Sequence, residues 1–414
     1  MMLTINSYAP KKDFWGKYPN LLIIGGGVLQ HETLTQCNVM GLGKILVDAN
    51  PDCYCAKSPA LNSNFFIKAD IKNKALVLSQ VKQWLKKHRD VKIVGVYTQG
   101  CDCAKTVAYV AKCLGLPSIG IDVAYKTNNK IAMRKAFDKA GILQPKWGDN
   151  IGLSCPVVVK PADNCASRGI TIVNDSLRFE RAIEVAKNNS SDGTYIIEEF
   201  IDGKEYSVDT VVYKGVVYPA GISDRVFLPK DNFAIQDGSI TPSFLPAETQ
   251  QRMYWIMQNC ADALGVKWGA FKGDLIVDKN NNIYVLEVTA RLSGGFDSQF
   301  RKPYSYGINL IKATIDLACG KELDFADLIP KWSKFSQTFT IFPKPGIIKE
   351  IIGEEELREI PGIRQVFITK HVGELVEYKS CADRVVHIIA CADTYEQLQK
   401  TIQKARETLQ FVTE

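Results

Sequence analysis

Residues 273–291 have the sequence GDLIVDKNNNIYVLEVTAR, and this stretch decides the fold of the chain. Its flanks are rich in apolar and β-branched residues, and residues 278–282 between them are turn-forming, so we expect a β-hairpin. If the turn is centred between Asn280 and Asn281, Asp274 lies directly opposite Glu287. Like charges that face one another across two strands, with Cβ atoms roughly 4.5–5.5 Å apart, destabilise a sheet. The hairpin therefore predicts a bound cation between the two carboxylates.

The other residues on that face of the hairpin indicate which ligand the cation serves. Side chains alternate between the two faces of a strand, so Thr289 and Arg291 are expected to follow Glu287 on this face. Ile276 and Val285 are expected on the other side of the carboxylate pair. Oxygen ligands of this kind are typical of Mg²⁺, which commonly bridges carboxylates to substrate phosphates. Nucleotide chemistry is the first hypothesis, and an ordinary surface hairpin with a different register is its alternative.

The composition is that of a globular enzyme. With 414 residues, 46% of them hydrophobic and 23% charged, the chain is long enough for roughly two to four domains. Its net charge of +6 is not clustered, so nucleic-acid binding is not indicated. No apolar run has the length of a membrane span, and the N-terminus has no signal-peptide pattern. The 12 cysteines include no CxxC pair, and we expect reduced thiols in a cytoplasmic protein.

Residues 1–120 are expected to form a Rossmann-like open sheet, because apolar strands alternate with helical segments. The strands are predicted at 21–24, 45–47 and 92–97, and the helices at 75–88 and 104–114. The first strand runs into Gly25-Gly-Gly27 and the second ends at Asp48, as in a dinucleotide-binding loop with an acidic ribose ligand. Gln30, however, stands where the third glycine of that pattern belongs. A tight turn or a contact with another substrate is therefore favoured over NAD binding.

Two lysines are candidates for phosphate binding. Lys130 lies in the first turn of an amphipathic basic helix predicted over residues 128–140 and ended by Gly141. Lys160 ends the strand that follows, before a small-residue loop that contains Ser167, Arg168 and Gly169. A lysine beside such a loop can hold a phosphate, with loop amides as further donors. The P-loop pattern GxxxxGK[ST] is absent, and a solvated lysine at a strand end is the alternative for Lys160.

Acidic residues gather around two further predicted strands between residues 195 and 213. The segment Glu198-Glu199-Phe200-Ile201 is predicted to be an extended hinge whose backbone groups can pair with the edge of a purine, because such groups often orient ligands in apolar clefts. Glu205 could accept hydrogen bonds from ribose hydroxyls. For all three glutamates a charged edge strand is the alternative.

Taken in this order, these motifs resemble those of the ATP-grasp superfamily, and the resemblance covers the whole chain. The resemblance implies a combined α/β and α+β fold. It places a Rossmann-like pre-ATP-grasp domain at residues 1–120, and an ATP-grasp domain at 121–328 whose lid subdomain covers about 121–197. A small α+β domain follows at 329–414, and it contains no catalytic motif.

The resemblance also implies how ATP would be bound. The two lysines would bind the phosphates and the loop after the second would close over them as a lid. The hinge would pair with adenine, Glu205 with the ribose, and Ile276 would pack under the purine. The implied ATP-binding residues are Lys130, Lys160, Ser167, Arg168, Gly169, Glu198, Glu199, Phe200, Ile201, Glu205 and Ile276.

The metal ligands implied by the resemblance are Asp274 and Glu287, with Mg²⁺ or Mn²⁺ as the ion. Thr289 would be a further ligand, and it replaces the asparagine of the family's E-x-N-x-R pattern. A threonine hydroxyl can still bind a metal, but this departure puts a second ion in doubt. The catalytic residues would be Arg291, which would contact the transferring phosphate, and Lys160.

The implied activity is that of an ATP-dependent, ADP-forming carboxylate–amine ligase. A substrate carboxylate would attack the γ-phosphate to give an acyl phosphate, and an amine would then displace phosphate to form an amide. Closure of the lid would protect the intermediate from water. The expected partners are ATP, a small carboxylic acid and an amine, with a homodimer as the usual form of such enzymes.

Two further motifs, at 291–296 and 342–347, resemble the L-amino-acid ligase group and its carbamoyl-phosphate-synthase-like neighbours. Amino-acid-like substrates are therefore expected. The loop Ser293-Gly294-Gly295 could bring backbone amides to a substrate carboxylate. Arg225 and Asp237 could line the substrate pocket, with a structural role as the alternative for each.

Three other functions stay open on the sequence. Bicarbonate activation, as in a carboxylase or a carbamoyl-phosphate-synthase-like enzyme, would use the same fold. No internal repeat of the kind found in the two-halved synthase is visible, and no carrier motif is present. An NAD-dependent oxidoreductase and a non-catalytic nucleotide sensor are the alternatives from other classes.

Overall fold

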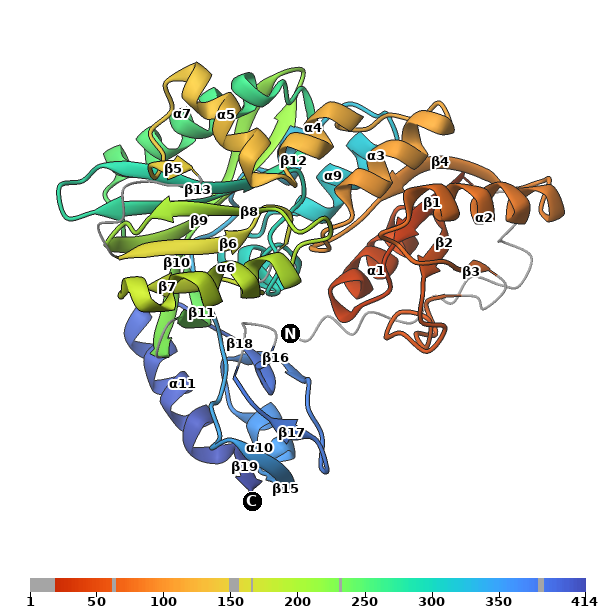
Figure 1. Ribbon diagram of the computed structural model, residues 1–414. Helices are drawn as coiled ribbons and strands as arrows, with labels where there is room; N and C mark the ends of the chain where they lie inside the picture. The colour runs from red at the N-terminus through yellow and green to blue at the C-terminus, as the bar shows by residue number, and fades with distance from the viewer. Residues whose placement is uncertain (1–18, 62–64, 149–155, 165–166, 231–232, 379–382) are drawn as a thin grey trace.

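The structure is a computed structural model that describes residues 19–61, 65–148, 156–164, 167–230, 233–378 and 383–414 (Figure 1). It confirms the expected fold class, with a Rossmann-like domain followed by mixed α and β units. None of the helices in this described part of the chain combines the length and the apolar character that a membrane crossing requires.

The first unit is a parallel four-stranded sheet in the order β3-β2-β1-β4, shown in red and orange in Figure 1. Its central strands are almost wholly buried because helices cover both faces of the sheet. The strands are β1 (Pro19–Ile24), β2 (Gly43–Asp48), β3 (Phe66–Lys68) and β4 (Lys92–Tyr97), and the helices are η2 (Val28–Gln30), α1 (His31–Val39), α2 (Lys74–Lys87) and α3 (Ala104–Cys113).

A small antiparallel sheet, which we call the lid sheet, follows with the order β5-β8-β6-β7. Helix α5 leads into it, and that helix begins at the Asn129 cap and ends at Gly141 in a left-handed conformation, as its sequence predicts. The elements are α4 (Ile121–Lys126), α5 (Lys130–Ala140), β5 (Trp147–Gly148), β6 (Val157–Pro161), β7 (Thr171–Val173), η4 (Ser176–Arg178), α6 (Phe179–Asn188) and β8 (Tyr195–Glu199).

The largest element is an eight-stranded antiparallel sheet in the order β13-β12-β9-β10-β11-β14-β18-β16, which we call the central sheet. Its strands are β9 (Gly203–Tyr213), β10 (Val216–Lys230), β11 (Phe233–Thr241), β12 (Trp268–Asp278), β13 (Ile283–Thr289), β14 (Phe335–Phe339), β16 (Ile363–Ile368) and β18 (Val386–Ala392). The hydrogen-bonded sheet is continuous across residue 328, where the sequence suggests a domain boundary.

Helices pack on the central sheet and complete the C-terminal part. One face of β9 and β12 packs with α5 and α7 in an apolar core that includes Val208, Val212 and Leu275. The helices are α7 (Ala247–Leu264), the π-helical turn η5 (Asp297–Arg301), α8 (Lys302–Tyr306), α9 (Leu310–Ala318), η6 (Phe325–Asp327), α10 (Glu354–Glu359) and α11 (Tyr395–Thr408). A three-stranded sheet comprises β15 (Gly346–Ile352), β17 (Leu375–Val376) and β19 (Gln410–Thr413).

Candidate functional site

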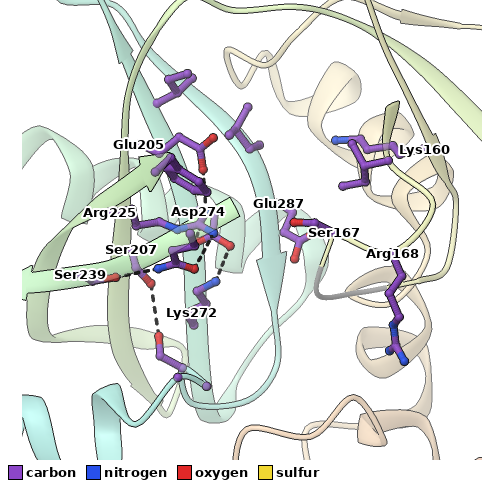
Figure 2. A pocket seen from close by; sticks show the side chains of 18 of the residues that line it. Lys160, Ser167, Arg168, Glu205, Ser207, Arg225, Ser239, Lys272, Asp274 and Glu287 are labelled. Carbon is purple, nitrogen blue, oxygen red and sulfur yellow. Dashed lines mark hydrogen bonds and ion pairs between the residues drawn. The ribbon is translucent and has the colours of Figure 1, made fainter. Parts of the chain in front are cut away.

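A single cavity of about 440 Å³ lies between the lid sheet and the central sheet, and it collects most of the residues singled out in the sequence (Figure 2). Its floor is the hairpin of β12 and β13. Asp274 pairs with Glu287 in the ladder, as the position of the turn predicts. The turn is held by the carboxylate of Asp278, which accepts hydrogen bonds from the backbone N–H groups of Asn280 and Asn282.

A β-bulge changes one detail of the predicted hairpin face. The register shifts between Asp274 and Leu275, so that Leu275 pairs with Val285 and Leu286 is the extra residue. Leu286 and Glu287 both line the cavity, whereas Val285 is fully buried in the core under α7. The prediction that Val285 shares the face of Ile276 was therefore wrong, because a bulge interrupts the alternation of side chains between the two faces of a strand.

Basic side chains compensate the two facing carboxylates. Lys272 forms an ion pair with Asp274 Oδ2, and Arg225 Nη1 lies 3.5 Å from Asp274 Oδ1. Lys130 Nζ lies 3.6 Å from Glu287 Oε2. Burial alone would raise the pKa of Asp274, but the charges of Arg225 and Lys272 outweigh it and the pKa is lowered. Asp274 therefore stays ionised.

Two rows of mostly polar residues cross the face of the central sheet that carries the cavity floor, because residues opposite one another in a ladder share a face. The first row joins Asp274 to Ser207 on β9 and Ser223 on β10, whose hydroxyl lies 2.8 Å from that of Thr241 on β11. The second row contains Ile276, Glu205, Arg225, Ser239 and Thr338. The cavity floor thus extends from the carboxylates of Asp274 and Glu287 toward β14.

Arg225 and Glu205 are joined within the second row (Figure 2). Arg225 Nη1 donates to Glu205 Oε2 at 2.6 Å, and Arg225 Nη2 donates to Gln236 at 3.2 Å. Burial is the main cause that raises the pKa of Glu205, although Arg225 opposes it. A ribose hydroxyl would therefore share Glu205 with this arginine.

A buried ion cluster joins the lid sheet to the hairpin. Glu198 lies between Arg134 Nε at 2.9 Å and Lys160 Nζ at 2.5 Å. Arg134 also donates to the carbonyls of Val285 and Leu286, at 3.0 and 2.6 Å. Burial would raise the pKa of Glu198, yet the charges of Arg134 and Lys160 lower it to about 2. Burial is also the main cause that lowers the pKa of Lys160.

The lid loop faces the hairpin across the cavity. Figure 2 shows Lys160, Ser167 and Arg168 on the side opposite Glu205, with Glu287 between the two groups. Ser167, at φ 59°, and Arg168 line the cavity. Gly169 does not line it: an added Cβ would lie 2.6 Å from Asn189 Cβ, so this glycine allows close packing at φ 74°.

The hinge residues Glu198, Glu199, Phe200 and Ile201 all line the cavity, as does Ile276. Part of their backbone is already used. The N–H of Glu199 donates to the carbonyl of Lys146 at 2.8 Å, and that of Phe200 to the carbonyl of Pro156 at 3.3 Å. A purine would have to pair with the remaining backbone groups of this segment.

Arg291 and the glycine loop after it form the wall toward the first domain. Arg291 Nε donates to Asp102 at 2.8 Å, and both residues line the cavity. Ser293, Gly294 and Gly295 also line it. Asp209 anchors the loop, because its Oδ1 accepts from the backbone N–H of Ser293 at 3.1 Å and from its hydroxyl at 2.9 Å.

Two known protein-family models match parts of this chain. A model of the ATP-grasp domain matches residues 153–299, and a model of the L-amino acid ligase C-terminal domain 2 matches residues 338–414. The chain therefore contains an ATP-grasp domain followed by a C-terminal domain of the L-amino acid ligase kind.

Individual relatives are distant in sequence. Alanine–anticapsin ligase from Bacillus subtilis is 25% identical over 250 residues, which cover 52% of this chain and 52% of that protein, so the match spans about half the length of the relative. Among solved structures, an L-amino acid ligase from Bacillus licheniformis has a TM-score of 0.83 at 22% identity, with 96% and 99% of the two chains covered. A biotin carboxylase domain from Hydrogenobacter thermophilus, with magnesium, ADP and bicarbonate, has a TM-score of 0.73 at 17% identity and covers 96% and 91%. These two structures share the fold.

Two more residues predicted for the ATP-grasp site lie outside the cavity lining. Thr289 is buried at 8% exposure. Asp237 points to the C-terminal part, where Arg406 pairs with it at 2.7 Å and the N–H of Thr340 donates to it at 3.1 Å. The structure therefore gives Asp237 a structural contact, and the prediction of a substrate contact does not match its position.

The glycine loop of the first domain is filled by its own residues. Asp48 Oδ2 accepts from the N–H of Gly26 at 2.6 Å, and a Cβ added to Gly26 would lie 2.3 Å from the sulfur of Cys53. Gln30 is buried and donates to the carbonyl of Gln99 at 2.7 Å. The Asp48 carboxylate and the Gly26 N–H, two groups that an NAD site would use, are thus bonded to one another.

The residues present fit a magnesium ion that also binds nucleotide phosphates. Asp274 Oδ1 and Thr289 Oγ1 are buried and have no hydrogen-bond partner among the described residues. Two carboxylates and a hydroxyl form an oxygen-only donor set, which Mg²⁺ prefers. Within the described ranges, no group of three or more His, Cys, Asp or Glu side chains could hold a metal by itself. Phosphate oxygens would have to complete the coordination.

The sequence did not indicate several residues of the cavity, which come from all three parts of the chain. Lys272 could have been found, because it lies two residues before Asp274 and so shares its face. The others depend on contacts between distant segments that carry no local signal. The missed lining residues include Asp102, Ser207, Gln236, Ser239, Lys272, Asp297, Arg301, Thr338 and Arg384.

Proposed function

We propose that this protein is an ADP-forming carboxylate–amine ligase that acts on amino-acid-like substrates. The proposal is carried by one observation: the facing carboxylates Asp274 and Glu287 form the floor of a cavity whose opposite wall holds Lys160 and Arg168, within the region matched to the ATP-grasp domain. The match to an L-amino acid ligase C-terminal domain and the similarity to alanine–anticapsin ligase support the substrate class.

In this proposal ATP lies between the two sheets. Lys130 and Lys160 neutralise the phosphates, and the segment 167–169 covers them. The hinge at 198–201 and Ile276 enclose the purine, and Glu205 accepts from the ribose. Phosphoryl transfer depends mainly on positioning and charge neutralisation, so we expect lysines and an arginine to be the residues that assist it.

Asp274 and Glu287, with Thr289 behind them, would hold Mg²⁺, which would supply further neutralisation of phosphate charge. Mn²⁺ has the same ligand preference. Arg291, held by Asp102, would contact the phosphoryl group as it moves to the substrate carboxylate. The loop 293–295 would offer backbone N–H groups to an anionic intermediate.

The reaction proceeds in two steps. The substrate carboxylate oxygen attacks the γ-phosphorus, and the bond from that phosphorus to the bridging oxygen breaks to release ADP. The nitrogen of a neutral amine then attacks the acyl carbon, the bond from that carbon to the phosphate oxygen breaks, and the proton lost by nitrogen is carried away on the released phosphate. The lid must exclude water between these steps, because hydrolysis of the acyl phosphate would waste ATP.

The test is ADP release from ATP and Mg²⁺, measured across single and paired amino acids, with ADP separated from AMP. ADP formation that requires two amino acids together supports the proposal. Glu287→Gln serves as the background control. ADP release that requires bicarbonate instead would favour a carboxylase, the function to which the biotin carboxylase domain among the structural neighbours points.

We further propose a homodimer in a reducing compartment. The nine cysteines among the described residues are free thiols, and free thiols persist in a reducing compartment. Light scattering of the purified protein tests the dimer, and a monomer mass would contradict it.

A further inference from the structure

Two buried polar atoms at the far end of the cavity have no hydrogen-bond partner among the described residues. They are Oδ1 of Asp297, on the π-helical turn η5, and Oγ1 of Thr338, on β14. Each residue is 2% exposed, and both line the cavity. A buried polar atom without a hydrogen-bond partner is destabilising, so a ligand group that bonds to both atoms would remove that penalty.

Arg301 contacts both Asp297 and the strand that pairs with Thr338. Its guanidinium lies 2.7 Å from Asp297 Oδ2 and donates to the carbonyl of Ser239 at 2.9 Å. Ser239 is the ladder partner of Thr338. Arg301 thus links Asp297 to the strand pair that carries Thr338, at the end of the cavity where η5 contacts β14.

The chemistry of this end of the cavity selects a hydrogen-bond donor. Asp297 Oδ2 already accepts from Lys302 at 3.2 Å and lies 3.4 Å from the Ser223 hydroxyl. Burial would raise the pKa of Asp297, but the charges of Arg301 and Lys302 outweigh it and keep the carboxyl ionised. The unused Oδ1 can only accept a hydrogen bond, and Thr338 can donate or accept. A hydrogen-bond donor therefore fits Asp297 Oδ1 better than a substrate carboxylate, which would meet a like charge at this oxygen.

The donor groups of an amino acid are its amino and side-chain N–H or O–H groups. An ionised carboxylate stabilises the protonated form of an amine, whereas the amine that attacks an acyl phosphate must be neutral. The group held here is therefore an ammonium that does not react. Asp297 lies beside Ser223, which is two strands away from Asp274 in the central sheet. Two strand spacings are roughly 10 Å, so this ammonium lies apart from the metal site at Asp274.

We propose that Asp297 Oδ1 and Thr338 Oγ1 bind the ammonium group of the amino acid whose carboxylate is activated. The inference rests on the proposed ligase function and deepens it by assigning the amino end of the first substrate. It makes Asp297 and Thr338 specificity-determining residues that distinguish amino acids from simple carboxylic acids.

The test uses binding, so it does not require the second substrate. The thermal midpoint of the full chain is measured with L-alanine, L-serine and L-glutamate, each against its analogue without the amino group: propionate, 3-hydroxypropionate and glutarate. Each titration is run with and without a non-hydrolysable ATP analogue and Mg²⁺. We expect at least one amino acid, and none of the analogues, to raise the midpoint of the wild-type protein.

Thr338→Val is the decisive variant, because valine keeps the β-branched shape and removes only the hydroxyl. We expect the half-saturating amino-acid concentration to rise about tenfold. The midpoint without ligand should stay equal or increase, because an unsatisfied hydroxyl is removed. Thr338→Ser should restore binding. Asp297→Asn should weaken binding as well, although it also disturbs the pair with Arg301.

Ser336→Ala is the matched control on the same strand. The Ser336 hydroxyl donates to the carbonyl of Ala390 at 2.9 Å and does not line the cavity. This variant should lower the ligand-free midpoint and leave the half-saturating concentration unchanged, which is the opposite pattern to Thr338→Val.

Equal shifts with amino acids and their analogues would overturn the inference, as would wild-type affinity in both Thr338→Val and Asp297→Asn. A wild-type protein that responds to the nucleotide analogue but to no amino acid would also overturn it and leave the nucleotide site standing. An amino-acid shift without any nucleotide shift would support the ammonium site and contradict the ligase function.

Discussion

At the scale of single residues, Glu287 and Lys160 both face the nucleotide part of the cavity but differ in what holds them. The Glu287 side chain is 27% exposed and has one ion pair, at 3.6 Å. Lys160 is buried and neutralises Glu198 at 2.5 Å. Lys160→Ala would therefore remove both a phosphate contact and a partner of a buried charge, so Glu287 is the cleaner position for a test of chemistry.

We predict that Glu287→Gln lowers the rate of ADP formation about 100-fold or more, because it removes a charge that would hold the metal at the transferring phosphate. The thermal midpoint should stay close to that of the wild type. Glu322→Gln, which removes an exposed carboxylate far from the cavity lining, is the control and should keep full activity. A fully active Glu287→Gln protein would contradict the metal assignment.

A second prediction concerns pH. The pKa of Glu198 is about 2 in the folded protein, below its ordinary value of 4.5, so its contribution to stability is fully present above pH 4.5 and is lost as the pH falls toward 2. Glu198→Gln should lower the free energy of unfolding by about 3–5 kcal/mol at neutral pH. The difference from the wild type should shrink as acid is added.

Urea unfolding at several pH values measures this difference. Glu199→Gln is the matched control, because the neighbouring carboxylate lies at the edge of the cavity outside the buried cluster. A stability difference for Glu198→Gln that does not change with pH would show that charge pairing is not its cause.

At the scale of elements, the hairpin could be predicted because its information is local. Asp278 and the three asparagines determine the turn, and the turn determines that Asp274 faces Glu287. The bulge at Leu286 could not be predicted, because it is stabilised by Arg134, 152 residues earlier in the chain. Asp237 was misplaced for a related reason: the register of β10 and β11 shifts between Val226 and Phe227.

Arg134 is the residue that ties three elements together, and this gives a third prediction. Its guanidinium on α5 bonds Glu198 of β8 and two carbonyls of β13. The single ammonium group of lysine cannot reproduce the planar arrangement of donors with which the guanidinium bonds all three groups. Arg134→Lys should lower the free energy of unfolding by about 3–5 kcal/mol, measured by urea denaturation. Lys135→Arg, at an exposed position on the same helix, should be neutral. A stable Arg134→Lys protein would contradict this role.

At the scale of the whole molecule, the central sheet connects the ATP-grasp domain to the C-terminal part through β11 and β14. The sequence separates these parts near residue 328, because pairing between distant strands leaves no local pattern. The same junction holds Thr338, so the far end of the cavity depends on it.

A fourth prediction tests this junction. A Cβ added to Gly238 would lie 1.6 Å from the carbonyl oxygen of Thr338 on β14, so Gly238→Ala must push the two strands apart. We expect a lower thermal midpoint and a loss of ADP formation, with a cost of about 1–3 kcal/mol or more. Gly27→Ala is the control, because its Cβ would meet nothing within 4 Å. A wild-type midpoint for Gly238→Ala would contradict the continuous sheet.

The proposed function depends above all on activation of a substrate carboxylate as an acyl phosphate. Its most direct test supplies ATP, Mg²⁺ and paired amino acids whose carboxylates carry ¹⁸O, and follows ADP together with the label in the released phosphate. We predict one ¹⁸O in phosphate for each ADP formed, with an amide product. Unlabelled phosphate, or AMP in place of ADP, would contradict it.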